Sequence, residues 1–442
     1  LMRKAPLLAV CVLSLGTPTV GAIDLLDTYL AALGNDSTYL AARSALQATQ
    51  QNIPLARANL LPRIALTGQQ TANETNNRFT QANQQLETDT AYSARNAGLT
   101  LRQPLFRLQA WHQFSAAQAQ VAAAEAEYEK ERQAAALRAA DAYFGVLQTA
   151  AEVKASRAEL DAYTSQQMLA DKAFSAGYGT RIDIHESQAR LKQAQAQLMQ
   201  TEFSADNARQ NFQATVGLEP DHLADIDLPQ FRPAPPAPAT LEPWLEQLEV
   251  ANPELASLRH QLEAARKNYQ ANRARHFPTA DLVAGRQYGQ GDTVNTIDRK
   301  YLTDYVGVQV MIPIFEGGGT TALIRQASAT IDTTRHQFDA GLKRLSLTAQ
   351  QAFARNVQGT LQIPALEQAL EAAQLAVVST ERGIEAGTST RVDVLNAIQR
   401  VTGIERDLSR ARYEFFLSRF HLAAAVGALD DDIVSEINKL LQ

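Results

Sequence analysis

The sequence predicts a mixed α and β membrane protein with two internal structural repeats, in which strand pairs alternate with long antiparallel coiled-coil helices. Three observations support this fold class. The segments Ala176–Asp183 and Ala386–Asp393 read almost alike at a spacing of 210 positions. Residues 105–176 contain no proline, and two pairs of stretches alternate apolar with polar residues. Repetition of this kind identifies the structural unit before any single motif does.

Residues 1–22 have the pattern of a secretory signal peptide. Arg3 and Lys4 precede an apolar stretch, and the small residues at positions 20–22 suit cleavage before Ile23. The only cysteine, Cys11, lies inside the apolar stretch. A lipoprotein acylated at Cys11 is the alternative, but the apolar run before Cys11 is short for that purpose. We therefore expect a mature chain without cysteine or disulfide.

The first repeat is expected to begin with a helix over residues 25 to about 58. A strand pair follows at residues 64–70 and 92–103, and a second pair lies at residues 280–288 and about 306–312. In the last of these, Val306, Val308 and Val310 alternate with polar or small residues, which is the period of a strand. The connecting residues 71–91 and 289–300 are rich in Asn, Gln, Thr and Asp, and they are predicted to be solvated loops.

Strands with one apolar and one polar face belong more often to a soluble sandwich than to a membrane. Four strands, however, are few beside helices of this length. In a secreted chain they also fit an outer-membrane barrel, which requires this alternation. Four strands cannot close a barrel, and an open strand edge in lipid is very costly. A membrane location therefore requires several chains that share one barrel.

The helical segments are unusually long. A helix over residues 105–176 would extend about 100 Å at 1.5 Å per residue. Its narrow, Ala-rich apolar stripes favour coiled-coil pairing. Pro104 and Pro313 mark the two strand-to-helix junctions, where the first helical turn tolerates a missing N–H. Pro364 lies midway through the second long helix and is expected to kink or break it.

Each repeated segment reads as a tight turn between two helices. Gly177 and Gly387 suit the left-handed conformation that ends a helix. Thr180 and Thr390 can cap the next helix, with Asp183 and Asp393 three positions later completing a capping box. Capping accounts for both aspartates without any further role, although a capping aspartate can also present its charge to a pore.

These features together resemble the TolC family of outer-membrane efflux and type I secretion channel proteins. The resemblance rests on the signal peptide, the two repeats, the Ala-Gly-x-x-Thr-x-x-Asp turns and the Val-Gly pairs at 216–217 and 426–427. It implies a homotrimer with a twelve-stranded outer-membrane β-barrel, to which each chain gives four strands. An α-helical barrel would continue it through the periplasm. The implied partners are outer-membrane lipid, a periplasmic adaptor (membrane fusion) protein and an inner-membrane ABC or resistance-nodulation-division transporter.

The resemblance also divides the chain. The first repeat spans residues 23–227, a Pro-rich linker spans 228–243, and the second repeat spans 244–428. Residues 429–442 would join an equatorial belt around the helices.

Site residues follow from the resemblance position by position. Asp393 and Asn396 would lie at the periplasmic entrance, and Asp183 would belong to a closing network. Ile384 and Ser389 depart from the family pattern of that network, and Arg391 or Arg181 could replace only its charge. The residues expected to contact the adaptor are those of the two turns: Gly177, Tyr178, Gly179, Thr180, Gly387, Thr388, Ser389 and Thr390.

No pattern in the sequence indicates an enzyme. The seven histidines have no metal-ligand spacing, no nucleotide or cofactor fingerprint is present, and a net charge of −6 gives no footprint for nucleic acid. The sequence thus predicts a passive export duct for proteins or small molecules, with a weak preference for type I secretion. The alternative is a structural or adhesive periplasmic coiled-coil protein with surface loops, which would not need the alternating strands.

Overall fold

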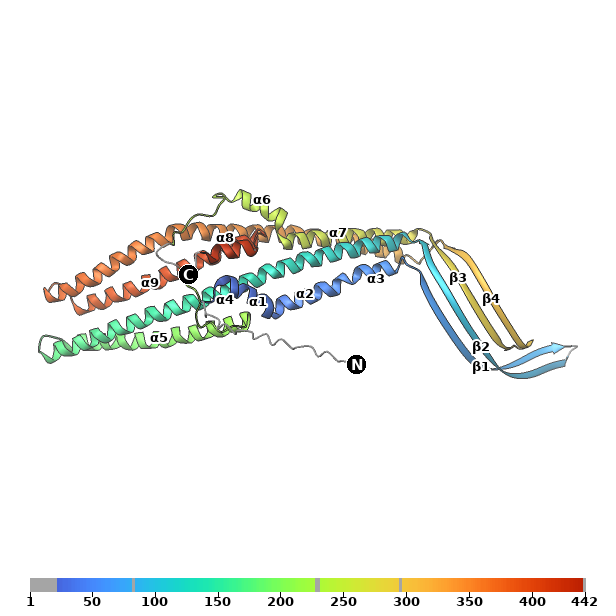
Figure 1. The fold of residues 1–442 in the computed structure, drawn as a ribbon, viewed down its shortest axis with the longest axis horizontal. Helices are drawn as coiled ribbons and strands as arrows, with labels where there is room; N and C mark the ends of the chain where they lie inside the picture. Colours follow the sequence, from blue (N-terminus) through green and yellow to red (C-terminus); the bar gives the residue numbers. More distant parts are fainter. Residues whose placement is uncertain (1–21, 82–83, 227–230, 294–295, 440–442) are drawn as a thin grey trace, which may run out of the picture.

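The computed structural model describes residues 22–81, 84–226, 231–293 and 296–439. Residues 1–21 of the predicted signal peptide, with Cys11, lie outside the described residues. The molecule is strongly elongated, with long helices at one end and a curved four-stranded sheet at the other (Figure 1). Both termini of the described chain lie near the middle of its length.

The two halves repeat one order of elements. The first half contains α1 (Leu25–Asn35), α2 (Ser37–Gln50), α3 (Asn52–Ala58), β1 (Arg63–Gln81), β2 (Gln84–Phe106), α4 (Leu108–Ser175) and α5 (Arg181–Val216). The second half contains α6 (Glu242–Ala251), α7 (Pro253–Arg273), the 3₁₀ turn η1 (Ala274–His276), β3 (Thr279–Thr293), β4 (Thr296–Met311), α8 (Gly319–Glu385) and α9 (Arg391–Ala425). The short helix α10 (Asp431–Asn438) follows.

The prediction of a single helix over residues 25–58 is wrong, because this range forms the three helices α1, α2 and α3. Asp36 adopts an extended conformation and caps α2, accepting a hydrogen bond from Thr38 N at 2.8 Å. Its carboxylate also pairs with Arg138 of α4. The cap ends one helix and starts the next, and the ion pair fixes that break against the long helix.

The four strands form one antiparallel sheet in the order β1-β2-β3-β4. The strands are where the alternation predicted them, but the predicted loops 71–91 and 289–300 are wrong. The β1–β2 ladder continues to the pair Gln81 and Gln84, and β3 pairs with β4 as far as Thr293 and Thr296. Polar side chains do not oppose pairing here, because they bond across the ladder, as Arg78 does with Glu87.

The two junction prolines lie just before their helices. Pro104 is within the end of β2, where the register against β3 shifts between Pro104 and Phe106. Pro313 lies between the end of β4 and the start of α8. The prediction that both prolines lie in a first helical turn is wrong, because α4 begins at Leu108 and α8 at Gly319. At Pro104 the shifted register accommodates the missing N–H instead.

The two longest helices are continuous. α4 has 68 residues and α8 has 67, which correspond to about 100 Å each. The break expected at Pro364 is wrong, because α8 runs through it. The preceding residue, Ile363, is fully buried in the central core, and this packing holds the helix across the missing hydrogen bond.

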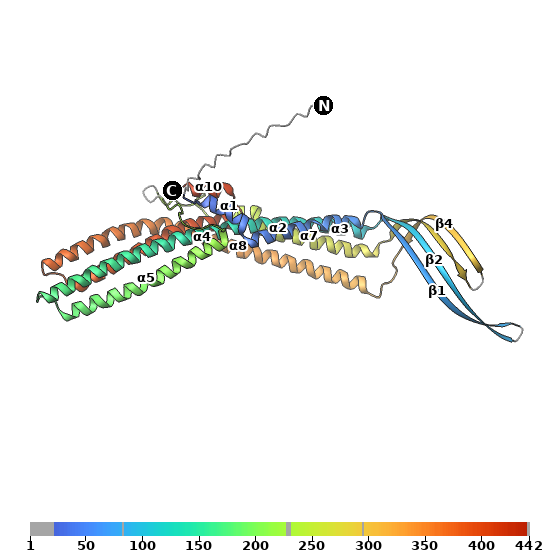
Figure 2. The same cartoon turned by 60° about the horizontal axis from the view of Figure 1, so that its bottom comes forward.

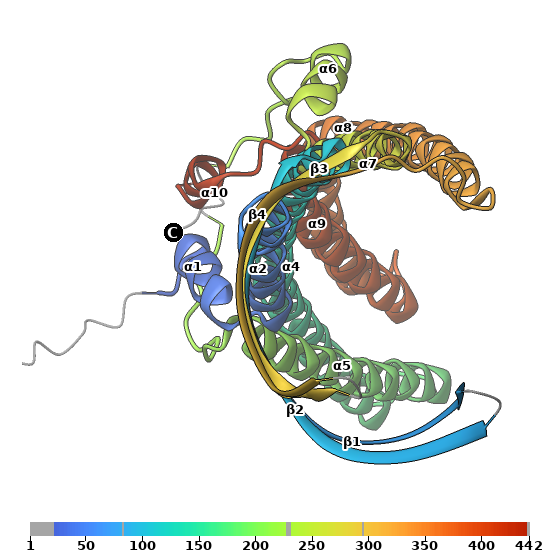
Figure 3. The ribbon, with the colours of Figure 1, turned by 90° about the vertical axis from the view of Figure 1, so that its right-hand side faces the viewer.

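The helices form an open arc that follows the curve of the sheet (Figure 3). Along it, α4 contacts α5, α7 and α9, while α8 contacts α7 and α9. None of the helices built by the described residues is both long enough and apolar enough to cross a membrane.

The main core lies at mid-length, around a group of aromatic rings. Phe144 of α4 stacks on Phe416 of α9 with ring centroids 5.7 Å apart. The Tyr143 hydroxyl donates to Ala224 O at 2.5 Å, and Asn438 of α10 donates to Asp24 at 2.7 Å. The start of the described chain, the connection between the halves and α10 therefore meet on one outer side of the helices (Figure 2).

Candidate functional site at the helical tips

Two helical hairpins end side by side at the end of the molecule opposite the sheet (Figure 1). Residues 176–180 join α4 to α5, and residues 386–390 join α8 to α9. Gly177 has φ +86° and Gly387 has φ +74°, the left-handed conformation predicted for both turns. The turns form the same backbone bonds, in which Gly179 N donates to Ala173 O at 3.0 Å and Ser389 N donates to Gly383 O at 3.1 Å.

Both predicted capping boxes are confirmed. Asp183 N donates to Thr180 Oγ1 at 3.2 Å, and Thr180 N donates to Asp183 Oδ2 at 2.9 Å. The corresponding distances between Asp393 and Thr390 are 3.3 Å and 2.7 Å. Each threonine hydroxyl also donates to its aspartate at 2.7 Å. These bonds satisfy first-turn amides and place a negative charge at each positive helix end.

The environment of Asp393 favours its ionised form. Hydrogen bonds from the Thr390 hydroxyl, and then from the Thr390 backbone N–H, lower the pKa of Asp393 below 3.8. The carboxylate is exposed, so it presents a negative charge to solvent at the end of the molecule. The structure does not bring Arg181 or Arg391 to these carboxylates, since each aspartate bonds to its own capping threonine.

The two tips differ in their apolar exposure. Phe174, Tyr178 and Ile182 of the first tip are 40%, 77% and 75% exposed. The matching positions of the second tip hold Ile384, Thr388 and Val392, of which Ile384 and Val392 are half-buried. The two tips therefore share one backbone conformation but differ in how much apolar side chain they expose.

Asn396 of the second tip accepts a hydrogen bond from Arg190 of α5. Arg190 donates to Asn396 Oδ1 at 3.3 Å and to Gln399 Oε1 at 2.8 Å, both on α9. It also pairs with Glu186 on its own helix at 3.3 Å. Sequence reasoning missed Arg190, whose spacing from Glu186 suggests only a pair along one helical face.

A small apolar core joins the hairpins behind this polar link. Tyr163 of α4 and Ala194 of α5 pack with Val394, Leu395 and Ile398 of α9. Burial, followed by the nearby Glu159 carboxylate, raises the pKa of Tyr163 to about 12. Arg406 of α9 forms an ion pair with Glu159 of α4. Polar bonds and packing thus hold α9 against the first hairpin.

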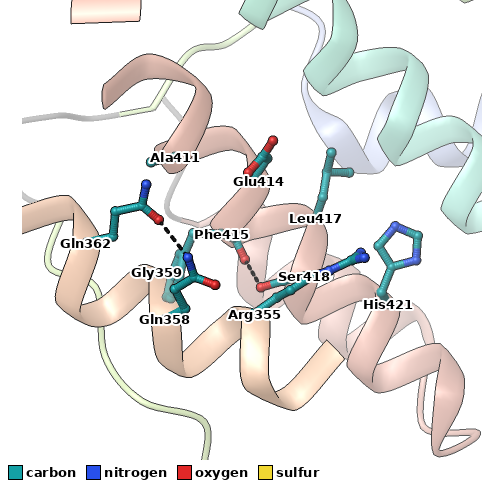
Figure 4. Close-up of a pocket in the computed structure, with 10 residues that line it drawn as sticks. All are labelled: Arg355, Gln358, Gly359, Gln362, Ala411, Glu414, Phe415, Leu417, Ser418 and His421. Carbon is teal, nitrogen blue, oxygen red and sulfur yellow. Dashed lines mark hydrogen bonds between the residues drawn. The ribbon is translucent and has the colours of Figure 1, made fainter. Parts of the chain in front are cut away.

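A hollow with a volume of about 490 Å³ lies between α8 and α9, far from the tips. Figure 4 shows Arg355, Gln358 and Gln362 on one helix opposite Glu414 and His421 on the other. Within the part of the chain that the structure describes, no three His, Cys, Asp or Glu side chains gather as metal ligands. This hollow thus offers no metal centre, and the tips remain the candidate site.

Comparison with known proteins identifies a family that has this architecture. The family model of the outer membrane efflux proteins matches residues 28–218 and 244–428, covering both repeats. The alkaline protease secretion protein AprF of Pseudomonas aeruginosa is 31% identical over 412 residues, covering 93% of this chain and 85% of that protein. The outer membrane protein TolC of Vibrio cholerae is 29% identical, covering 99% and 98%.

Solved structures agree in fold. The outer membrane protein VceC of Vibrio cholerae has a TM-score of 0.77 at 21% identity, covering 91% of this chain and 96% of that one. The CusC channel has a TM-score of 0.80 at 17% identity, covering 92% and 93%. The chain therefore belongs to the outer membrane efflux protein family, as a TolC-like channel protein of the outer membrane that extends into the periplasm.

Proposed function

We propose that three copies of this chain close into one passive duct across the outer membrane and periplasm, through which proteins or small molecules are exported. The observation that carries this proposal is that the chain is an open arc. The sheet order leaves the outer edges of β1 and β4 unpaired, and unpaired backbone groups are very costly in lipid. Pairing β1 of one copy with β4 of the next removes every edge.

The faces of the sheet suit this arrangement. One face carries exposed apolar side chains on three strands, including Leu66, Leu99, Val306 and Val308. Among the described residues of this face, two cross-strand ion pairs, Arg286 with Asp304 and Arg78 with Glu87, each carry no net charge. The opposite face carries mainly polar and small residues. The apolar face would contact lipid and the polar face would line the lumen.

The helices at the ends of the arc are also incomplete. On α8 the exposed residues Leu347, Leu361 and Leu375 recur at multiples of seven, and on α5 Ile182 and Phe203 do the same. Exposed apolar residues at heptad spacing are the seam of a coiled coil. We infer that α8 of one copy packs against α5 of the next, which continues the barrel as a helical tunnel.

In this duct each repeat supplies one strand pair and one hairpin. Residues 23–227 and 244–428 form the repeats, residues 228–243 connect them, and residues 429–442 join the equatorial belt. The chain carries no nucleotide motif, so energy must come from a partner. The tip residues Gly177–Thr180 and Gly387–Thr390 would dock a periplasmic adaptor and an inner-membrane transporter. The names of AprF and of the proteases secretion protein PrtF of Dickeya chrysanthemi support protein export.

At the entrance we assign Asp393 to a ring of three carboxylates and Asn396 to the closing link made by Arg190. Planar-bilayer recording of the detergent-purified protein tests the first assignment. Asp393→Asn should weaken block by a trivalent cation added on the periplasmic side, whereas Asp183→Asn, with the same cap at the other tip, should not. Unchanged block in Asp393→Asn removes that residue from the entrance. A monomer without conductance contradicts the duct.

Docking is tested by co-purification from cells. Tagged protein should bring down an adaptor and a transporter, and identification of the transporter decides between the ABC and the resistance-nodulation-division classes. Lengthening the first tip by Gly-Ser insertion between Tyr178 and Gly179 should abolish capture while leaving conductance intact. Capture that survives insertions in both tips would place docking elsewhere.

A further inference from the structure

We propose that the base of the barrel holds an anion-binding ring built by Arg63 and Arg102. This inference rests on the proposed trimer, in which the polar face of the sheet lines the lumen. Arg63 of β1 lies directly opposite Arg102 of β2 in the strand register. Residues opposite each other in an antiparallel pair project from the same face, so both guanidinium groups belong to the polar face.

Among the residues that the structure describes, no carboxylate forms an ion pair with either of these two arginines. Arg63 donates to the amide oxygen of Asn59 at 2.6 Å, and Arg102 donates to that of Gln309 at 3.2 Å. Both side chains are exposed. Like charges placed directly opposite each other destabilise a sheet, so the stability of the sheet does not account for this pair.

The nearest acid on this face is already occupied. Asp281 of β3, whose side chain is 9% exposed, accepts two hydrogen bonds from Arg107, at 2.9 Å and 2.6 Å. Among the described residues of the four strands, Asp281 is the one carboxylate on the polar face. Its charge is cancelled by Arg107, and those of Arg63 and Arg102 remain.

Strand β4 of the next copy does not supply the missing acid. Arg63 lies on β1, which would pair with β4 of the next copy. The described β4 residues that share the polar face are Arg299, Tyr301, Thr303, Tyr305, Gly307, Gln309 and Met311. None of them is acidic, so the conclusion holds for any register between the copies.

Three copies would therefore place six guanidinium groups in one ring where the barrel meets the helices. A hollow of about 350 Å³ lined by Arg102, Arg107, Asp281 and Gln309 opens beside them. Guanidinium groups bind carboxylate and phosphate in bidentate geometry, and a charged ring in a narrow passage concentrates counter-ions. The ligand class is polyvalent anions, including acidic segments of an exported chain. The arginine ring would be positively charged, whereas the aspartates at the tips are negatively charged.

The test is block of reconstituted channels by inorganic tripolyphosphate added on the barrel side. We expect the double variant Arg63→Gln/Arg102→Gln to need about tenfold more tripolyphosphate for half block. Arg95→Gln removes an equal charge per site from the opposite face of β2 and should leave block unchanged. The charge-preserving variant Arg63→Lys/Arg102→Lys should keep most of it. If the double variant does not assemble, the single glutamine variants are tested instead. Each should need about threefold more tripolyphosphate for half block.

If the channels conduct and tripolyphosphate blocks the wild type and the glutamine variants equally, the proposal of an anion-binding ring is wrong. The proposal of a duct is not affected by that result. Loss of block in Arg95→Gln to the same extent would also overturn the ring, because a general surface charge would then explain the effect. Absence of conductance in the wild type would overturn the duct itself, and the ring with it.

Discussion

Ser389 lies against Gly383 so closely that its Oγ occupies the space a Cβ on Gly383 would need. The first tip reaches the same close approach with the glycine on the other side. There Gly179 faces Ala173 and Phe174, and a Cβ on Gly179 would come within 2.6 Å of Phe174 N. Each tip thus has a glycine at a close approach within its turn, but a Cβ there would meet side-chain atoms in the second tip and backbone atoms in the first.

This difference predicts that a second substitution can rescue the second tip but not the first. Gly383→Ala should destabilise the second tip by about 1–3 kcal/mol through overpacking, and adding Ser389→Gly should recover most of that loss. In the first tip, Gly179→Ser should be destabilising because its Cβ would meet the backbone of Ala173 and Phe174, and Ala173→Gly should not rescue it. Hydrogen exchange of the tip amides measures each effect. Additive losses in the Gly383→Ala/Ser389→Gly double variant would contradict the contact between these two residues.

The cap at Asp393 predicts a pH dependence of the second tip. Its folded-state pKa lies below the usual 3.8 because the Thr390 hydroxyl and N–H bond to the carboxylate. The cap is therefore fully stabilising above pH 3.8 and is lost as the pH falls through the lowered pKa. Exchange rates of the first α9 amides should rise in that acidic window. Asp393→Asn should remove the dependence, and a rise that persists in that variant would show another titrating group.

The link from Arg190 to Asn396 and Gln399 predicts an effect on opening. If this link favours the closed tips, Arg190→Gln removes about 1 kcal/mol from that state and raises the ratio of open to closed channels about fivefold. Bilayer recordings of open probability measure this ratio. Arg209→Gln is the matched control, since Arg209 pairs with Asp206 of the same helix and both side chains are exposed. An equal change in the control would exclude a specific link.

The mid-length core predicts a loss of stability at alkaline pH. Burial raises the pKa of Tyr143 and Tyr413 above 10.0, and nearby carboxylates reinforce the shift. Below pH 10 both phenols are neutral in either state. Above it the unfolded chain ionises first, so stability falls as the pH rises. Melting temperatures from pH 8 to 11 should show this fall.

Variants separate that cause from general alkaline damage. Tyr413→Phe should flatten the alkaline fall, at a cost of about 1 kcal/mol at neutral pH for the lost bond to Asp225. Tyr178→Phe, at a position 77% exposed, should leave the fall unchanged. A fall of the same slope in Tyr413→Phe would remove that residue from the explanation.

The sequence predicted the repeat, the long helices, the strands and the capped tips, because each has a local signal in periodicity or capping chemistry. It failed where distant contacts decide. The break after Asn35 depends on Asp36 reaching Arg138 of α4, and the continuity at Pro364 depends on the packing of Ile363. The ladder beyond Thr71 forms between polar residues whose composition favours loops.

The tip site shows the same division. The capping of Asp183 and Asp393 could be read from spacing alone. The contact of Arg190 with Asn396 joins residues 206 positions apart, and no local pattern announces it. The charge of the barrel base likewise becomes visible only when the strand register places Arg63 opposite Arg102.

Crosslinking between copies tests the central claim most directly. In a Cys11→Ser background, Thr67→Cys on β1 is combined in turn with a cysteine replacing Thr303, Tyr305, Gly307 or Gln309 on β4, and outer membranes are oxidised. Within one chain these strands are separated by β2 and β3, so a disulfide must join two copies. Three copies closed in a ring predict, for the pair in register, a ladder that ends at the covalent trimer. Products longer than three chains, or no crosslink in any pair of a folded channel, would contradict the account.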